Sequence, residues 1–215
     1  MDTAVMMTAT TMTQNDLLMG YASGTLSPGM QMLCAAHLEI SGEASDTLAL
    51  GEEIGGAFLK SMPTAGVVPL DFDALTARID AQASEAEPIG SQPLPDAVKS
   101  ALGMRFDEIP WRFRLPGLSE YVLEGFDGER VSLMRARPGA AILQHTHEGD
   151  EATLILAGAL KDGDRVLRRG EISLAGPDHH HHPEIHGDEI CYSLAVSQGV
   201  RFTGTLGRAI NLFLD

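Results

Sequence analysis

The stretch HTHEGDE, residues 145–151, places two histidines and three acidic residues within seven positions. Imidazole nitrogens and carboxylate oxygens are ligands that divalent transition metals accept. Side chains two residues apart on a β-strand point to the same face, so His145 and His147 can face one interior together. A His-x-His pair alone also occurs in surface loops, so the residues around it must decide between a loop and a metal site.

Two glycines frame this stretch. Gly139 lies six positions before His145, and Gly158 lies seven positions after Glu151. Glycine allows the sharp turns that a strand needs at its ends. We therefore expect Glu151 to follow a turn and to return on the next strand, toward the two histidines.

A second segment offers a further histidine. Gly170 is followed by ten residues and then His181, which belongs to the tract HHHH at 179–182. On a strand His179 would share the face of His181, so either one could supply the fourth ligand. The predicted ligand set is His145, His147, Glu151 and His181. The other two histidines of the tract are expected at the surface.

The elements around these residues read as short strands. Several segments alternate or are continuously apolar and are punctuated by glycine or proline, which predicts an antiparallel sandwich or small barrel. These segments are RVSLMRARPG, ATLILAGAL, EISLAG, ICYSLAVS and VRFTGTLG.

The first part of the chain has a helical period instead. Ser27, Pro28 and Gly42 mark the start and the end of one helix, Asn15 is expected to cap an earlier one, and Asp71 a later one. Together with the apolar residues of 45–61, these signals predict about four short helices, the content of a small bundle. So small a bundle buries only part of its apolar surface, so some of the following side chains should stay available to a partner: Leu17, Leu18, Met30, Leu33, Phe58 and Phe72.

Between the two parts, residues 84–96 contain three prolines and lack an apolar period, which predicts a linker. The expected fold is therefore two-domain α+β. Residues 1–83 form a helical bundle, 84–96 the linker, and 97–215 an all-β domain.

Composition excludes several classes of function. The net charge of −15 argues against direct nucleic-acid binding, and residues 1–95 alone carry 12 acids against two bases. Such an acidic surface suits a basic partner. The sequence has no apolar run long enough for a membrane span and no signal peptide, and its two cysteines form no disulfide framework, so we expect a cytoplasmic protein.

The spacing G-x5-H-x-H-x3-E-x6-G resembles the first motif of the cupins at every fixed position. The second cupin motif is looser, because Gly176 and Asp178 stand where proline and glycine are usual, while His181 keeps its place. The resemblance implies a cupin barrel, a double-stranded β-helix, which can also form a homodimer. Iron(II), manganese or nickel would suit three histidines and a glutamate as well as zinc does.

The order of the parts narrows the resemblance. Residues 16–41, DLLMGYASGTLSPGMQMLCAAHLEIS, followed by a proline-rich joint and a cupin, resemble the ChrR-type anti-sigma factors. That family implies an N-terminal domain that holds an extracytoplasmic-function (ECF) sigma factor inactive. It also implies a zinc-bearing cupin that responds to singlet oxygen or organic peroxides.

The chain departs from that family at two places. The N-terminal zinc motif, H-x3-C-x2-C, survives only as His37, because Ser41 and Ala44 replace the cysteines, so we expect no zinc there. Cys191 is retained after the second cupin motif, but Ser193 occupies the place of its partner cysteine, which argues against a two-thiol switch.

These observations favour a non-enzymatic regulator that inhibits an ECF sigma factor through residues 1–83 and senses oxidative stress or a small ligand through a zinc-bound cupin. One alternative is a cupin metalloenzyme, such as a dioxygenase, with helices as an accessory. Another is an interaction module whose regulatory domain has lost its role.

Overall fold

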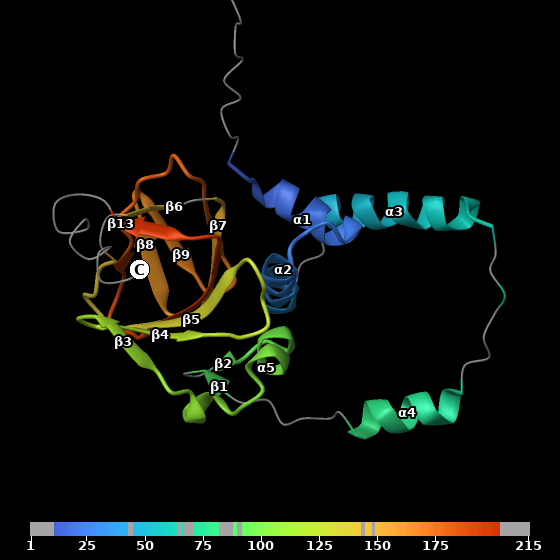
Figure 1. Ribbon diagram of the computed structural model, residues 1–215, viewed down its shortest axis with the longest axis horizontal. Helices are drawn as coiled ribbons and strands as arrows, with labels where there is room; N and C mark the ends of the chain where they lie inside the picture. Colours follow the sequence, from blue (N-terminus) through green and yellow to red (C-terminus); the bar gives the residue numbers. More distant parts are fainter. Residues whose placement is uncertain are drawn as a thin grey trace, which may run out of the picture.

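The computed structural model describes residues 11–42, 45–63, 66, 71–81, 88–89, 92–142, 145–147 and 149–202. Helices occupy the N-terminal part and strands the C-terminal part, as the change of period predicts (Figure 1). The helices are α1 (Gln14–Ser23), α2 (Pro28–Ser41), α3 (Asp46–Ser61), α4 (Phe72–Ala81), α5 (Asp96–Leu102) and the 3-10 helix η1 (Phe106–Glu108).

Thirteen strands are described, and all of the pairings between them are antiparallel. They are β1 (Pro88–Ile89), β2 (Gln92–Pro93), β3 (Arg112–Leu115), β4 (Leu118–Val122), β5 (Arg130–Ala136), β6 (His145–His147), β7 (Glu151–Ala157), β8 (Ala159–Asp162), β9 (Arg165–Arg168), β10 (Ile172–Ala175), β11 (Glu184–Ile185), β12 (Cys191–Ser197) and β13 (Val200–Phe202). A six-stranded sheet has the order β10-β7-β12-β5-β4-β3, and smaller sheets pair β11-β8-β9, β13-β6 and β1-β2.

The larger sheets form a cupin-like β-sandwich, which confirms the predicted fold class. Leu118 and Ile155 of the six-stranded sheet pack against Leu160 and Leu167 of the β11-β8-β9 sheet in one buried cluster. Among the described residues the sheets are not hydrogen-bonded into one closed barrel.

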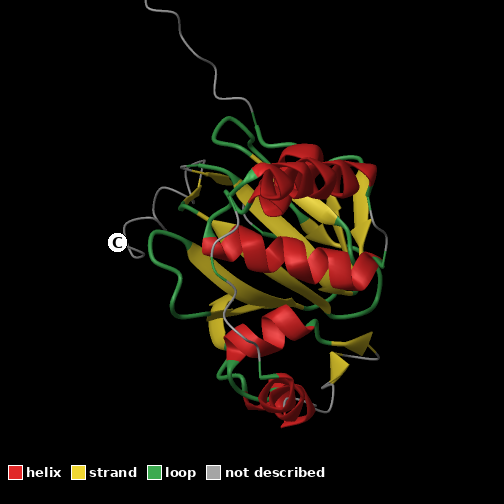
Figure 2. Ribbon diagram, turned by 90° about the vertical axis from the view of Figure 1, so that its right-hand side faces the viewer, coloured by secondary structure: helices red, strands yellow, loops and turns green. Residues whose placement is uncertain are grey.

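The other face of the six-stranded sheet is covered by helices (Figure 2). Leu33 of α2 is fully buried in a second cluster together with Val131, Leu154 and Leu194 of the central strands. Both faces of β7 and β12 are therefore buried, which explains why TLILAGAL is almost continuously apolar rather than alternating. The helices thus share one core with this face of the six-stranded sheet, and that core is distinct from the cluster between the sheets.

Local signals fix the ends of the helices. Thr13, not Asn15, caps α1: its hydroxyl accepts from the Asp16 amide while the Asp16 carboxylate accepts from the Thr13 amide. The Thr13–Asp16 pair satisfies two amides reciprocally, which a cap at Asn15 would not do. Pro28 begins α2, and Gly42 ends it in the left-handed conformation, with φ of 62°, as predicted.

Two hydrogen-bonded links join the ends of α2 to the sandwich. At its N-terminus the Glu129 carboxylate, from the turn before β5, accepts from the Ser27 hydroxyl and from the Gly29 amide at 2.8 Å. Near its C-terminus the buried imidazole of His37 donates from Nδ1 to the Gly170 carbonyl oxygen at 2.7 Å. A carboxylate at a helix N-terminus also complements the helix dipole.

Of the six apolar side chains among which some were expected to stay available to a partner, four are buried and two are exposed. Leu17, Leu18, Met30 and Leu33 are at most 6% exposed, because α2 packs on the sheet and α1 packs on α2 and α3. Phe58 and Phe72 are 68% and 70% exposed, as predicted.

Except for Phe113 on β3, the large exposed apolar side chains of the described residues lie between residues 50 and 75. We call the exposed apolar residues of α3, its C-terminal end and α4 the helical apolar surface. They are Leu50, Ile54, Phe58, Leu59, Met62, Phe72 and Leu75. Leu50, Ile54 and Phe58 recur every four residues and so share one side of α3. Figure 1 shows α3 extending away from the sandwich and α4 standing apart from it.

The predicted linker, residues 84–96, contains structure where it is described. Residues 88–89 and 92–93 pair as a short hairpin, Leu94 is 1% exposed within the core, and α5 begins at Asp96. The division into 1–83, 84–96 and 97–215 therefore stays a prediction. No helix in the described ranges is both long and apolar enough to cross a bilayer.

Candidate metal centre

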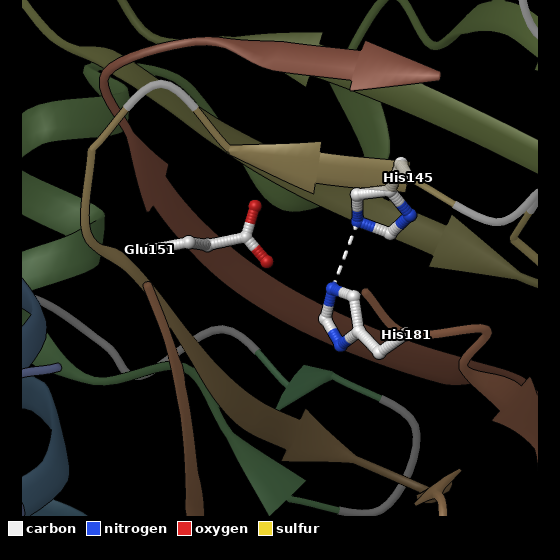
Figure 3. Close-up of side chains that lie close together, drawn as sticks. All are labelled: His145, Glu151 and His181. Carbon is white, nitrogen blue, oxygen red and sulfur yellow. Dashed lines mark hydrogen bonds between the residues drawn. The ribbon is translucent and has the colours of Figure 1, made fainter. Parts of the chain in front are cut away.

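Three of the four predicted ligands come together inside the sandwich. His145 begins β6, Glu151 begins β7, and His181 follows β10 and forms a β-bridge with His145. Their ligand atoms all lie within 4.8 Å of one another. Figure 3 shows the Glu151 carboxylate pointing toward both imidazole rings. The backbone of His147 lies in β6, but its side chain is outside the described residues.

The two imidazoles face each other directly. Nε2 of His181 lies 3.0 Å from Nε2 of His145, and their side chains are almost completely buried. Two nitrogens this close, beside a carboxylate, form a donor set that suits a divalent transition metal. Without an ion, one nitrogen donates to the other.

The electrostatics of Glu151 fit a cation. Burial raises the pKa of its carboxyl to about 7, and the nearby His181 only partly offsets that increase. Burial without full compensation penalises the ionised carboxylate. A divalent ion between Glu151, His145 and His181 would supply the missing positive charge.

The backbone conformation explains the two glycines of the first cupin motif. Gly139 and Gly158 both adopt φ of 74°, a conformation that favours glycine. A Cβ at Gly158 would also lie 2.7 Å from the Ile190 carbonyl oxygen, so no larger residue fits between β7 and β8. This turn follows β7 directly and so fixes the strand that carries Glu151.

The outer side of His181 carries a group that sequence reasoning missed. Asp162, the last residue of β8, accepts from Nδ1–H of His181 at 2.9 Å, and both side chains are buried. Ser173 donates its hydroxyl to the same carboxylate oxygen at 3.3 Å. Burial would raise the pKa of Asp162, but the hydrogen bond and charge of His181 outweigh it and hold the pKa below its ordinary value. The only sequence signal was an acid beside the turn Gly163–Asp164, which says nothing about a histidine 19 positions later.

The other three histidines of the tract line the outer pocket beside Asp162, away from the inner group. His179 lies near Asp162 rather than near His145, and it is exposed. His179, His180 and His182 line a pocket of about 290 Å³ together with Asp162 and Arg165. Of the two candidates for the fourth position, His181 is therefore the one that meets His145 and Glu151.

His37, the remnant of the N-terminal zinc motif, has a different role. Its Nδ1 is engaged by the Gly170 carbonyl, and the Gln14 side-chain amide lies 3.4 Å from its Nε2. Neither of the two possible metal-binding groups found among the described residues contains His37 or Cys34. The residue joins α1 and α2 to the sandwich.

Both cysteines are buried, and neither suits redox chemistry. Cys34 is 0% and Cys191 is 3% exposed, and burial raises their pKa values to about 11 and about 12. The thiolate is the reactive form, so at neutral pH both thiols stay protonated and shielded.

We predict that Ellman's reagent at pH 8 labels neither thiol of the folded chain within minutes, because a raised pKa suppresses the thiolate. In guanidinium chloride it should label both cysteines. Rapid labelling of one thiol in the native chain would contradict this prediction and restore a thiol-based sensor.

The fold is that of a cupin-like domain preceded by helices, and the three side chains form a group that could hold a metal ion. Residues 99–200 match the family described as the ChrR cupin-like domain. Those residues lie almost wholly within the sandwich and include every predicted ligand.

Within that class the similarity extends beyond the cupin. The chain is 28% identical over 205 residues to the anti-sigma-E factor ChrR of Cereibacter sphaeroides, covering 92% of this chain and 94% of that protein. The crystal structure of Rhodobacter sphaeroides SigE in complex with the anti-sigma ChrR covers 88% of this chain and 100% of the matched chain, with 25% identity and a TM-score of 0.69. The resemblance to ChrR-type anti-sigma factors is thus confirmed over almost the whole chain, and the proteins that match along this length are regulators by name rather than enzymes.

Proposed function

We propose that this chain is an anti-sigma factor that binds and inhibits an ECF sigma factor through its N-terminal helices. The observation that carries the proposal is the helical apolar surface, in a chain that is similar to an anti-sigma factor over 92% of its length. Among the described residues between 50 and 75, seven large apolar side chains are exposed, more than a monomeric protein usually leaves in contact with water on one segment.

Charge supports the same partner. Residues 1–95 carry a net charge of −10, from 12 acids and two bases. A sigma factor must approach the phosphates of promoter DNA, so part of its surface is basic and complements acidic helices. Inhibition then follows if the helices cover surfaces that the sigma factor needs for transcription. This function is exercised in the cytoplasm and needs no direct contact with nucleic acid.

We further propose that the cupin domain holds one zinc ion as its sensing centre. The ligands are His145, His147, Glu151 and His181. The ion would join the consecutive strands β6 and β7 to the segment that carries His181, which lies 30 residues beyond Glu151 in the chain. Since both thiols are buried, the response to oxidative stress or to a small ligand starts at this centre and not at a cysteine pair. Homodimerisation through the cupin remains an additional proposal.

Co-expression of the full chain with an ECF sigma factor from the same genome tests the partner. The wild-type pair should co-purify, more weakly at high salt because screening reduces the charge attraction. Phe58→Asp should weaken the complex by about 30-fold or more, which corresponds to the loss of about 2 kcal/mol typical of an aromatic hot spot.

Phe113→Asp is the matched control. Phe113 on β3 is 72% exposed, as Phe58 is 68%, but it lies on the sandwich away from α3. Its replacement should leave the affinity within about threefold of wild type, since surface substitutions outside an interface change little. If both variants bind as tightly as wild type, or if only Phe113→Asp fails, the helical apolar surface is not the binding site.

A further inference from the structure

We infer that Asp162 is a positioning residue for the metal centre, acting through His181. The inference rests on the metal site proposed above and assigns a role to a residue outside its ligand set. Asp162 is hydrogen-bonded to none of the other predicted ligands among the described residues, so its effect on the geometry of the site passes through the imidazole of His181.

The geometry fixes the state of His181. At neutral pH a carboxylate only accepts hydrogen bonds, so the 2.9 Å contact requires a proton on Nδ1 of His181. A neutral imidazole with its proton on Nδ1 has its lone pair on Nε2. Nε2 is the atom that faces His145 at 3.0 Å, on the side where Glu151 lies. Asp162 therefore selects the tautomer that can bind a metal at the inner site.

The same contact fixes the direction of the ring. The side chains of His181 and Asp162 are only 5% and 8% exposed, so water competes little for this hydrogen bond. Ser173 holds the carboxylate from β10, while the β-bridge to His145 holds the backbone of His181. Metal-bound histidines commonly donate their second N–H to such a carboxylate, which also raises the basicity of the ligating nitrogen.

The same atoms could instead serve an outer ion, because Asp162, His179 and His181 offer ligand atoms within 4.8 Å. Two observations favour positioning. Nδ1 of His181 is already engaged by Asp162, and Arg165 lines the outer pocket and adds a positive charge that disfavours a cation. Binding of an ion at this outer group is the competing result that the test must distinguish.

The test measures binding of Zn²⁺ and Co²⁺ to the full chain after removal of metal. Wild type should bind one ion. Asp162→Asn should still bind one ion, but about 10–100-fold more weakly, with a changed Co²⁺ d–d absorption spectrum. Asp162→Glu, which restores the carboxylate, should recover part of the affinity. Ser173→Ala should also weaken metal binding, but by less than Asp162→Asn does. It replaces Asp162→Asn in the test if that variant does not fold.

Asp164→Asn is the matched control, because Asp164 is exposed two positions later in the same turn. It should bind like wild type. Unchanged affinity and spectrum in Asp162→Asn would overturn the inference. The inference would also be overturned if wild type bound two ions and Asp162→Asn lost only the second of them. Asp162 would then be a ligand of the outer ion. If wild type itself bound no ion, the proposed metal centre would fail, a result distinct from failure of the positioning role alone.

Discussion

Leu33→Ala should destabilise the helices and the sandwich together, by about 2–5 kcal/mol in the free energy of unfolding. Leu33 is fully buried and packs in the cluster that also contains Val131, Leu154 and Leu194. Truncation removes apolar contacts and leaves a cavity between α2 and the sheet, which neither part can close alone. The loss therefore falls on one shared core.

Urea unfolding followed by two probes would check this. Far-ultraviolet circular dichroism reports the helices, and the fluorescence of Trp111, the only tryptophan, reports the sandwich, since its ring lies 6.1 Å from that of Tyr192 on β12. Both probes should give one transition, and both should shift in the variant. Leu59→Ala, at a side chain 72% exposed, should change stability by less than about 0.5 kcal/mol. Two separate transitions, of which only the first shifts, would mean that 1–83 and 97–215 fold independently.

His145→Ala should abolish stable metal binding, reducing the content from about one ion per chain to near zero. A four-ligand site that loses a buried imidazole keeps too few donors for a closed tetrahedral shell. Saturating wild type with zinc should raise its stability by about 2.7 kcal/mol at a free concentration a hundredfold above Kd, and the variant should gain almost nothing.

Elemental analysis after dialysis measures the content, and thermal unfolding with and without zinc measures the linkage. His182→Ala is the control, because that side chain is about half exposed and lies outside the inner group. If His182→Ala lost the ion while His145→Ala retained it, the metal site would lie in the histidine tract and not at the inner group.

Local signals predicted much of this molecule. Pro28 and Gly42 set the bounds of α2 through local backbone preferences, and Ser27 takes the N-cap position although its side chain makes no capping hydrogen bond. The spacing from Gly139 to Gly158 predicted the turns and strands that bring Glu151 toward His145, since alternation along a strand is fixed by geometry.

Features that depend on distant packing were not predicted. The apolar stripe of α2 could have faced a partner or a sheet, and only the fold shows that β7 and β12 bury Leu33. Likewise, the two-residue alternation of a strand placed His179 and His181 on one face. Only the β-bridge between His181 and His145 shows that His181 is the one at the inner group. Leu94 lies between two prolines and was predicted to belong to the linker. Its burial could not be predicted, because the residues that bury it are distant in the sequence.

The cap of α2 has a consequence for the order in which the chain is made. The carboxylate that completes the helix N-terminus belongs to Glu129, which is 102 residues beyond Ser27. Translation proceeds at about 5–20 residues per second, so α2 is synthesised about 5–20 seconds before its cap and roughly 8–30 seconds before β12, the last strand that covers it. During that interval Leu33 and its neighbours have no sheet to pack on. Nascent chains should therefore depend on chaperones, or on a sigma factor already present, until the strands have been synthesised.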